Sequence, residues 1–107
     1  MAAWSHSVET AFAIDHPTAA GHFPGNPIIP GALLLDAVLL AIGGDAPDAR
    51  DGAEIRSVKF LRPVRPGDTL LIRWEPRPNG ETRFEGLLRD PERLALTGVV
   101  RLGATSR

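Results

Sequence analysis

The 107-residue chain contains no cysteine, and this absence excludes several kinds of chemistry. Without thiols there are no disulfide cross-links, no thiolate metal sites and no cysteine nucleophile. The chain also has no large excess of charge, since its formal net charge is −1. This excludes a global basic field that would draw it to nucleic acid or anionic lipid. We expect the cytoplasm as its compartment and only local recognition of charged partners.

Long hydrophobic runs are missing as well. The longest apolar stretch, residues 32–42 with Asp36 passed over, is about half of the ~20 residues that a membrane-spanning helix needs. Residues 1–7 lack the basic segment and apolar run of a secretory signal peptide. The composition, with 43% hydrophobic and 23% charged residues, is that of an ordinary globular protein. We predict one soluble domain over residues 1–107, with no internal repeat or low-complexity segment.

Alternating hydrophobicity predicts the strands. Residues 8–14 alternate with a period of two, and a polar, turn-rich connection occupies residues 45–54. Further alternating segments are centred on Val58 and Phe60, on Leu70, Ile72 and Trp74, on Phe84, Gly86 and Leu88, and on residues 94–102, with turn signals at Pro66-Gly67-Asp68, Pro78-Asn79-Gly80 and Asp90-Pro91. Short strands that follow one another directly predict an antiparallel sheet.

A single helix is predicted from Pro30 to Ile42. The segment is apolar on all sides, which is typical of a buried helix. Pro30 stands at the first helical position, and Gly43 and Gly44 follow the last turn. One apolar helix and about five strands predict an α+β domain in which a curved antiparallel sheet wraps around the helix.

One carboxylate interrupts this apolar helix. Asp36 lies among alanine, leucine and valine residues. A charged group in such surroundings must lose its charge, find a partner, or lie where a ligand reaches it. The plain alternatives are an aspartate that faces solvent at a thin part of the fold, or one half of a structural hydrogen bond.

The residues before and after this helix carry a resemblance. Residues 21–31 read Gly-His-Phe-Pro-Gly-Asn-Pro-Ile-Ile-Pro-Gly, and Asp36 follows inside the helix. This pattern resembles the signature of the hotdog-fold β-hydroxyacyl-[acyl-carrier-protein] dehydratases of the FabA/FabZ type. Residues 58–68, Val-Lys-Phe-Leu-Arg-Pro-Val-Arg-Pro-Gly-Asp, resemble the strand and turn that follow the helix in that family. The resemblance implies a single hotdog domain and a hydro-lyase of fatty-acid or lipid metabolism.

The implied reaction turns a β-hydroxyacyl thioester into the trans-2-enoyl thioester and water. His22, with an ordinary pKa near ~6.5, is the expected general base. Asp36 is the expected acid, because desolvation in an apolar helix should raise the pKa of its carboxyl group. The free N–H groups at the start of the helix, that of Gly31 foremost, would meet the negative charge on the thioester oxygen. The reaction requires no metal and no organic cofactor.

The family also implies a homodimer in which His22 of one subunit faces Asp36 of the other, so that each dimer has two composite sites. A small sheet with free edges would gain stability by such pairing. The substrate is expected to be an acyl carrier protein or coenzyme A thioester. Its acyl chain would run between the subunits, along a tunnel whose expected lining is Phe23, Ile28, Ile29, Pro30 and Leu33.

Arg56, Lys59, Arg62 and Arg65 place four basic residues in ten positions with no acidic residue among them. They are either an ordinary solvated surface or a dock for an acidic carrier protein or the phosphate of its pantetheine arm.

Some positions depart from the family pattern. Many members carry glutamine one helical turn after the carboxylate, where its amide can orient the acid, but Leu40 occupies that position here. The carboxylate is an aspartate where many members have glutamate, and the short connection at residues 45–54 favours an open tunnel and a specialised lipid pathway. Two other functions stay open: a hotdog acyl thioesterase, and a non-catalytic hotdog subunit that binds acyl chains or a partner.

Overall fold

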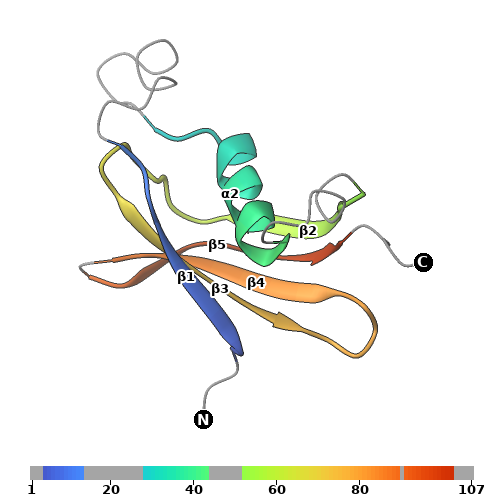
Figure 1. Ribbon diagram of the computed structural model, residues 1–107. Coiled ribbons are helices and arrows are strands. Elements are labelled where there is room, and N and C mark those ends of the chain that lie inside the picture. Colours follow the sequence, from blue (N-terminus) through green and yellow to red (C-terminus); the bar gives the residue numbers. More distant parts are fainter. Residues whose placement is uncertain (1–3, 14–27, 44–51, 90, 103–107) are drawn as a thin grey trace.

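The computed structural model describes residues 4–13, 28–43, 52–89 and 91–102. Within these ranges it contains one helix and five strands (Figure 1). They are β1 (His6–Ala11), α2 (Gly31–Gly43), β2 (Glu54–Phe60), β3 (Thr69–Pro76), β4 (Thr82–Leu88) and β5 (Arg93–Arg101). The predicted order of one strand, one helix and four further strands is confirmed. Most of the predicted connection at 45–54 lies outside the described residues.

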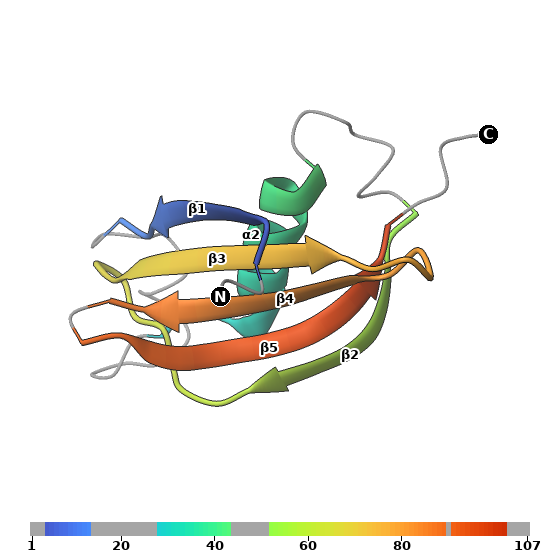
Figure 2. The ribbon, with the colours of Figure 1, turned by 90° about the horizontal axis from the view of Figure 1, so that it is seen from below.

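The described strands form one antiparallel sheet in the order β1-β3-β4-β5-β2 (Figure 2). The three central strands are neighbours in sequence as well as in space, whereas β1 and β2 form the two edges. Because α2 stands between β1 and β2 in the sequence, the chain crosses one face of the sheet on its way between the edges (Figure 1). The predicted α+β class is therefore confirmed.

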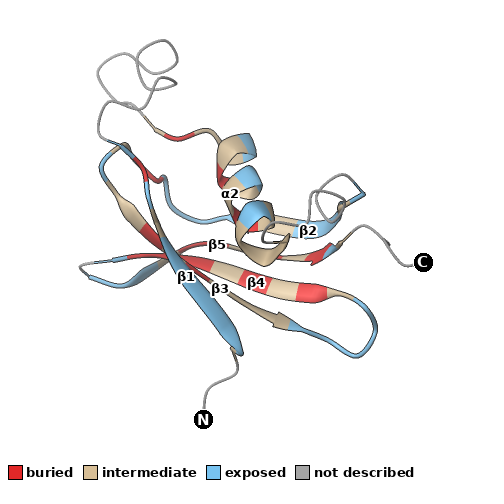
Figure 3. Ribbon diagram, viewed as in Figure 1, coloured by how far each residue is buried: buried red, intermediate tan, exposed pale blue. Residues whose placement is uncertain are grey.

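The core lies between α2 and the face of the sheet that the helix covers. Strand pairing aligns two rows of residues on this face, Ile72-Gly86-Leu96-Phe60 and Trp74-Phe84-Gly98-Val58. Ile72, Phe84 and Leu96 are fully buried, and burial of each such side chain stabilises the fold by roughly 1.5–3 kcal/mol. Buried residues accordingly concentrate on the central strands in Figure 3.

The helix is covered on one side only. Leu34 and Val38 are buried against the sheet, while Ala32, Asp36 and Leu40 form an exposed stripe at four-residue intervals (Figure 3). Residues four apart lie on the same face of a helix. The apolar pattern predicted a helix buried on all sides, and for the chain by itself that prediction is wrong, because one curved sheet can cover only one face.

Two turns have glycines in the left-handed region, Gly67 with a φ of 94° and Gly80 with a φ of 87°, a conformation that a side chain disfavours. Gly80 belongs to the predicted hairpin after β3, where Arg77 N donates to Glu81 O at 2.7 Å. Gly67 belongs to the predicted turn before β3, and its N–H donates to Phe12 O at 2.6 Å. This second bond ties the end of β1 to the turn.

The described part of the chain has no helix that is long and apolar enough to cross a membrane.

Candidate active site

The loop that enters α2 is fixed to the segment after β2. Ile29 is buried, and its N–H donates to the carbonyl oxygen of Val64 at 2.7 Å. The carbonyl of Pro30 accepts the first helical bonds, from Leu33 N at 3.0 Å and Leu34 N at 3.2 Å. The helix therefore begins at Gly31, one residue later than predicted, and the N–H of Gly31 precedes the helical hydrogen bonds, as the first N–H groups of a helix do.

An apolar pocket of about 430 Å³ opens where these two segments meet. Small-molecule sites in proteins occupy about 300–1,000 Å³. Its walls come from the loop and first turn of α2 and from the end of β2 with the residues that follow, and they consist of Ile28, Ile29, Gly31, Leu34, Phe60, Leu61, Arg62, Pro63 and Val64. Of the residues expected to line a substrate tunnel, the pocket thus includes Ile28 and Ile29, whereas Leu33 packs against the core.

Gly31 and Phe60 are in close contact at the mouth of this pocket. A Cβ atom on Gly31 would lie 2.9 Å from Cζ of the Phe60 ring. We expected that the lack of a side chain at Gly31 would let a thioester carbonyl approach the helix. In the structure this space is also occupied by the Phe60 ring, which forms part of the pocket wall. Because Phe60 is 47% exposed, its ring can turn outward into solvent.

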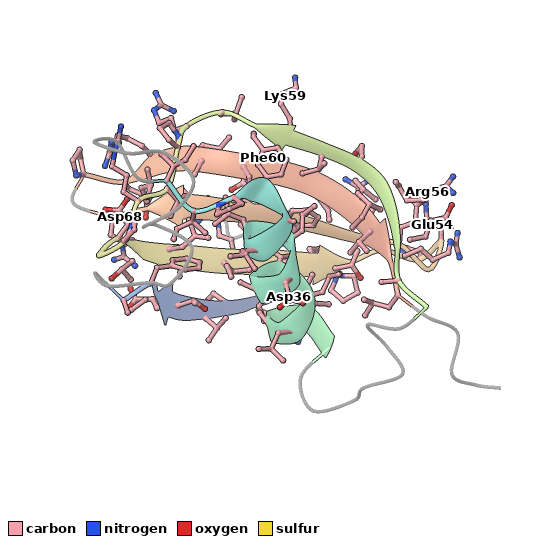
Figure 4. All side chains as sticks on the ribbon, turned by 90° about the horizontal axis from the view of Figure 1, so that it is seen from above. Asp36, Glu54, Arg56, Lys59, Phe60 and Asp68 are labelled. Carbon is pink, nitrogen blue, oxygen red and sulfur yellow. The ribbon has the colours of Figure 1, made fainter. Side chains whose placement is uncertain are left out.

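Asp36 lies on the face of α2 turned away from the sheet (Figure 4). In the chain by itself the residue is exposed, so the chain alone does not supply the apolar surroundings that the sequence predicted for this carboxylate. Leu40 is 51% exposed one turn further along the same stripe. The pocket and the carboxylate thus lie on different sides of the helix.

His22 and Phe23 lie outside the described residues. The distance from His22 to Asp36 is therefore not part of this geometry, and the pairing of base and acid stays a prediction. Among the residues that the structure describes, no group of three His, Asp or Glu side chains is placed to hold a metal ion.

The four basic residues of segment 56–65 do not form one patch. Arg56 makes ion pairs with Glu54 at 2.9 Å and Glu81 at 3.2 Å, at the end of β2 far from the pocket. Lys59 points away from the helix (Figure 4). Arg62 lines the pocket, and its Nη1 donates to Leu94 O at 3.0 Å. Residues 56–65 alone did not predict the ion pairs of Arg56, because Glu54 and Glu81 lie outside this segment.

Comparison with known proteins assigns the family. The model of the ApeI-like family, described as ApeI dehydratase, matches residues 2–95. The chain belongs to the ApeI-like dehydratase family. The dehydratase heterocomplex ApeI:P from Xenorhabdus doucetiae contains a chain of similar structure, with a TM-score of 0.75 and 26% identity over 91% of this chain and 85% of that one. The hotdog fold that the sequence resemblance implied is thereby confirmed.

Two curated relatives of this ApeI-like chain are 3-hydroxyacyl-[acyl-carrier-protein] dehydratases named FabZ. The protein of Thermus thermophilus is 35% identical, and the alignment covers 78% of this chain and 67% of the relative. The protein of Thermomicrobium roseum is 48% identical, with 55% of this chain and 44% of the relative covered. The ApeI-like chain therefore spans about two thirds of the Thermus thermophilus relative and less than half of the Thermomicrobium roseum relative.

Sequence reasoning missed the second wall of the pocket in this ApeI-like chain. Segment 58–68 was recognised as similar to a family patch, but none of its residues was assigned to the substrate site. Strand pairing is the signal that would have found it, because Phe60 is the register partner of the inward-facing Leu96. The four residues that follow, 61–64, form the rest of this wall.

Proposed function

We propose that this protein dehydrates a β-hydroxyacyl thioester to the trans-2-enoyl thioester and water. The observation that carries the proposal is the apolar pocket at the first N–H groups of α2, which follow nine residues after His22 in the sequence. His22 removes a proton from the carbon between the thioester carbonyl and the hydroxyl-bearing carbon. Asp36 gives a proton to the departing hydroxyl group, which leaves as water.

The start of α2 supplies the electrostatic part of this mechanism. As the proton leaves, negative charge develops on the thioester oxygen, and the N–H of Gly31 is the proposed donor to it. The helix dipole adds partial positive charge at the same end. The acyl chain lies against Ile28, Ile29 and the ring of Phe60, whose apolar surfaces favour a hydrocarbon. Phe23, Pro30 and Leu33 remain proposed contacts of the substrate.

A second copy of the chain completes the proposed site. Asp36 lies on the exposed stripe of α2 and is not among the residues that line the pocket of its own subunit. Apolar surface is uncovered at Leu40, on the same stripe as Asp36, and at Phe60 and Leu61 in the pocket wall; the three residues are 51%, 47% and 44% exposed. A partner that covers this surface would desolvate Asp36, and the proposal requires that it bring its own His22 to that carboxylate.

An assay of the reverse reaction tests the proposal. His22→Ala and Asp36→Asn should each lower the rate of hydration of a crotonyl thioester roughly 10²-fold, as loss of a general acid or base does. His6→Ala and Glu92→Gln are the matched controls, since both residues are exposed and lie outside the proposed site. The reading as an enzyme fails if both site variants keep the rate of the unaltered protein.

The products separate the alternatives. A hotdog acyl thioesterase would release a free acid, whereas the dehydratase forms an enoyl thioester that absorbs in the ultraviolet. A non-catalytic subunit would form neither, and the leucine at position 40, where many relatives of the FabA/FabZ type carry glutamine, favours this possibility. β-Hydroxyacyl thioesters of increasing chain length, presented on carrier protein and on coenzyme A, would define the substrate in the same assay.

A further inference from the structure

A second hollow lies on the opposite side of the sheet from the proposed active site. Pairing across the strands places Arg73, Glu85, Thr97 and Lys59 in one row on this outer face, and Glu75, Arg83, Val99 and Ser57 in the next. In Figure 4 the neighbours Lys59 and Phe60 accordingly point to opposite sides of β2. A groove of about 270 Å³ runs along the outer face, between β2 and the hairpin that joins β3 to β4.

Three cations from separate elements line this groove. Lys59 comes from β2, Arg83 from β4 and Arg77 from the hairpin. None of the three makes an ion pair with any residue that the structure describes. Glu85 binds Arg73 at 2.9 Å and Glu81 binds Arg56 at 3.2 Å, while Glu75 is the register partner of Arg83 and makes no ion pair with it. Three cations that make no ion pair with a described residue thus line one groove of a protein whose net charge is −1.

An aromatic ring restrains one of the three cations, and side chains with hydroxyl groups also line the groove. The guanidinium carbon of Arg83 lies 4.5 Å from the centroid of the Trp4 ring, a cation–π contact that restrains the side chain while leaving its N–H donors available. Ser57 and Thr97 also line the groove. The single hydroxyl proton of Thr97 is donated to Phe84 O at 3.2 Å, so Ser57 supplies the hydroxyl donor of the groove. Arginine forks, a lysine and hydroxyl groups are the donors that bind phosphate.

We propose that this outer groove binds a phosphate-bearing small molecule through Lys59, Arg77 and Arg83. Its volume suits a phosphate or diphosphate group, and three cations that line one groove match a ligand with two to three negative charges. An extended polyanion is disfavoured, because the rest of the surface supplies no basic field. The thickness of the sheet separates the groove from the apolar pocket, so binding does not depend on the proposed acid and base.

An NMR titration tests the site. Pyrophosphate, added to the ¹⁵N-labelled chain at fixed ionic strength, should shift the amide signals of Ser57, Lys59 and Val99 and saturate. Lys59→Gln combined with Arg83→Gln should weaken the affinity about tenfold or more. The matched control is Arg93→Gln, which removes an exposed cation from the start of β5 and should leave the affinity unchanged. An equal effect of the control, or shifts spread over all basic residues, would show unspecific screening and overturn the proposal.

Further ligands identify the source of the phosphate. Coenzyme A that shifts the same signals more strongly than pyrophosphate would indicate a nucleotide-bearing thioester, whereas tighter binding of pyrophosphate would indicate a free phosphate compound. Apo carrier protein, which has no phosphopantetheine arm, is the third probe. If it shifts these signals while pyrophosphate does not, the groove is a protein dock and the proposed small-molecule site is wrong.

Discussion

Gly98 occupies a place in the sheet where no side chain fits. A Cβ atom there would lie 2.7 Å from Cζ of Phe84 and would collide with the carbonyl oxygen of Ser57 on the edge strand. The Phe84 ring has no exposed surface and therefore cannot turn away. Gly31 differs, since its hypothetical Cβ meets the half-exposed ring of Phe60.

Gly98→Ala is expected to lower the free energy of unfolding by about 2–4 kcal/mol, because a buried ring and a backbone carbonyl must both shift. Gly31→Ala should cost less than about 1 kcal/mol, because the ring can swing outward and alanine favours the helix. Urea unfolding of the two variants measures the difference. Equal losses would mean that Phe60 is held as firmly as Phe84.

Arg62 is the candidate for contact with an anionic carrier, because it alone of the four basic residues in segment 56–65 lines the pocket. Arg62→Gln should raise KM about three- to tenfold for a carrier-bound substrate and leave small thioester analogues unaffected, since rim charges act mainly on encounter. Arg56→Gln is the control of equal charge, at a residue already paired with two glutamates. Steady-state kinetics on both substrates decide the matter, and equal effects on both would exclude a docking role.

Among the elements, the turn before β3 links the end of β1 to the segment that lines the pocket. Arg65 N donates to Asp68 Oδ2 at 2.8 Å, and Phe12 N donates to Asp68 O at 3.0 Å. The turn therefore holds the end of β1 beside the segment that forms the second pocket wall. Gly67, with its positive φ, makes this geometry possible.

Gly67→Ala is expected to destabilise the protein by about 1–2 kcal/mol, the cost of a left-handed conformation for a residue with a side chain. Glu92→Ala is the control, at an exposed turn residue, and it should change stability by less than about 0.5 kcal/mol. Thermal unfolding of the two variants tests this. Similar melting temperatures would show that the turn relaxes to another conformation.

The elements were predictable because their signals are local. Alternation defined β3, β4 and β5, and the glycine and proline turns separated them. The exposed stripe of α2 was not predictable, since an apolar helix pattern does not state which face the sheet covers. The contact of Gly31 with Phe60 and the ion pair of Arg56 with Glu81 were not predictable either, because each joins residues that are far apart in the sequence.

At the scale of the whole molecule, the proposed acid and the pocket lie on different sides of one helix. In the proposed dimer, a site that needs both therefore combines residues of two subunits. Two variants with defects in different residues should then restore each other's activity.

Mixed dimers of His22→Ala and Asp36→Asn subunits should regain activity. When the two variants are refolded together in equal amounts, half of the dimers are mixed and each mixed dimer has one intact composite site, so about a quarter of the original activity should return. Each variant refolded alone is the control. No recovery, with mixed dimers shown by mass spectrometry, would place base and acid in the same subunit.

From the positions of the two edge strands we expect a particular order of assembly. β3, β4 and β5 are joined by short turns and can pair as successive hairpins, whereas β1 must wait for β3 and β2 must wait for β5 across much longer stretches of chain. Closing such loops costs entropy before the contacts compensate for it. Because α2 connects the two edge strands, we expect the helix and both walls of the pocket to form only after the three central strands have paired.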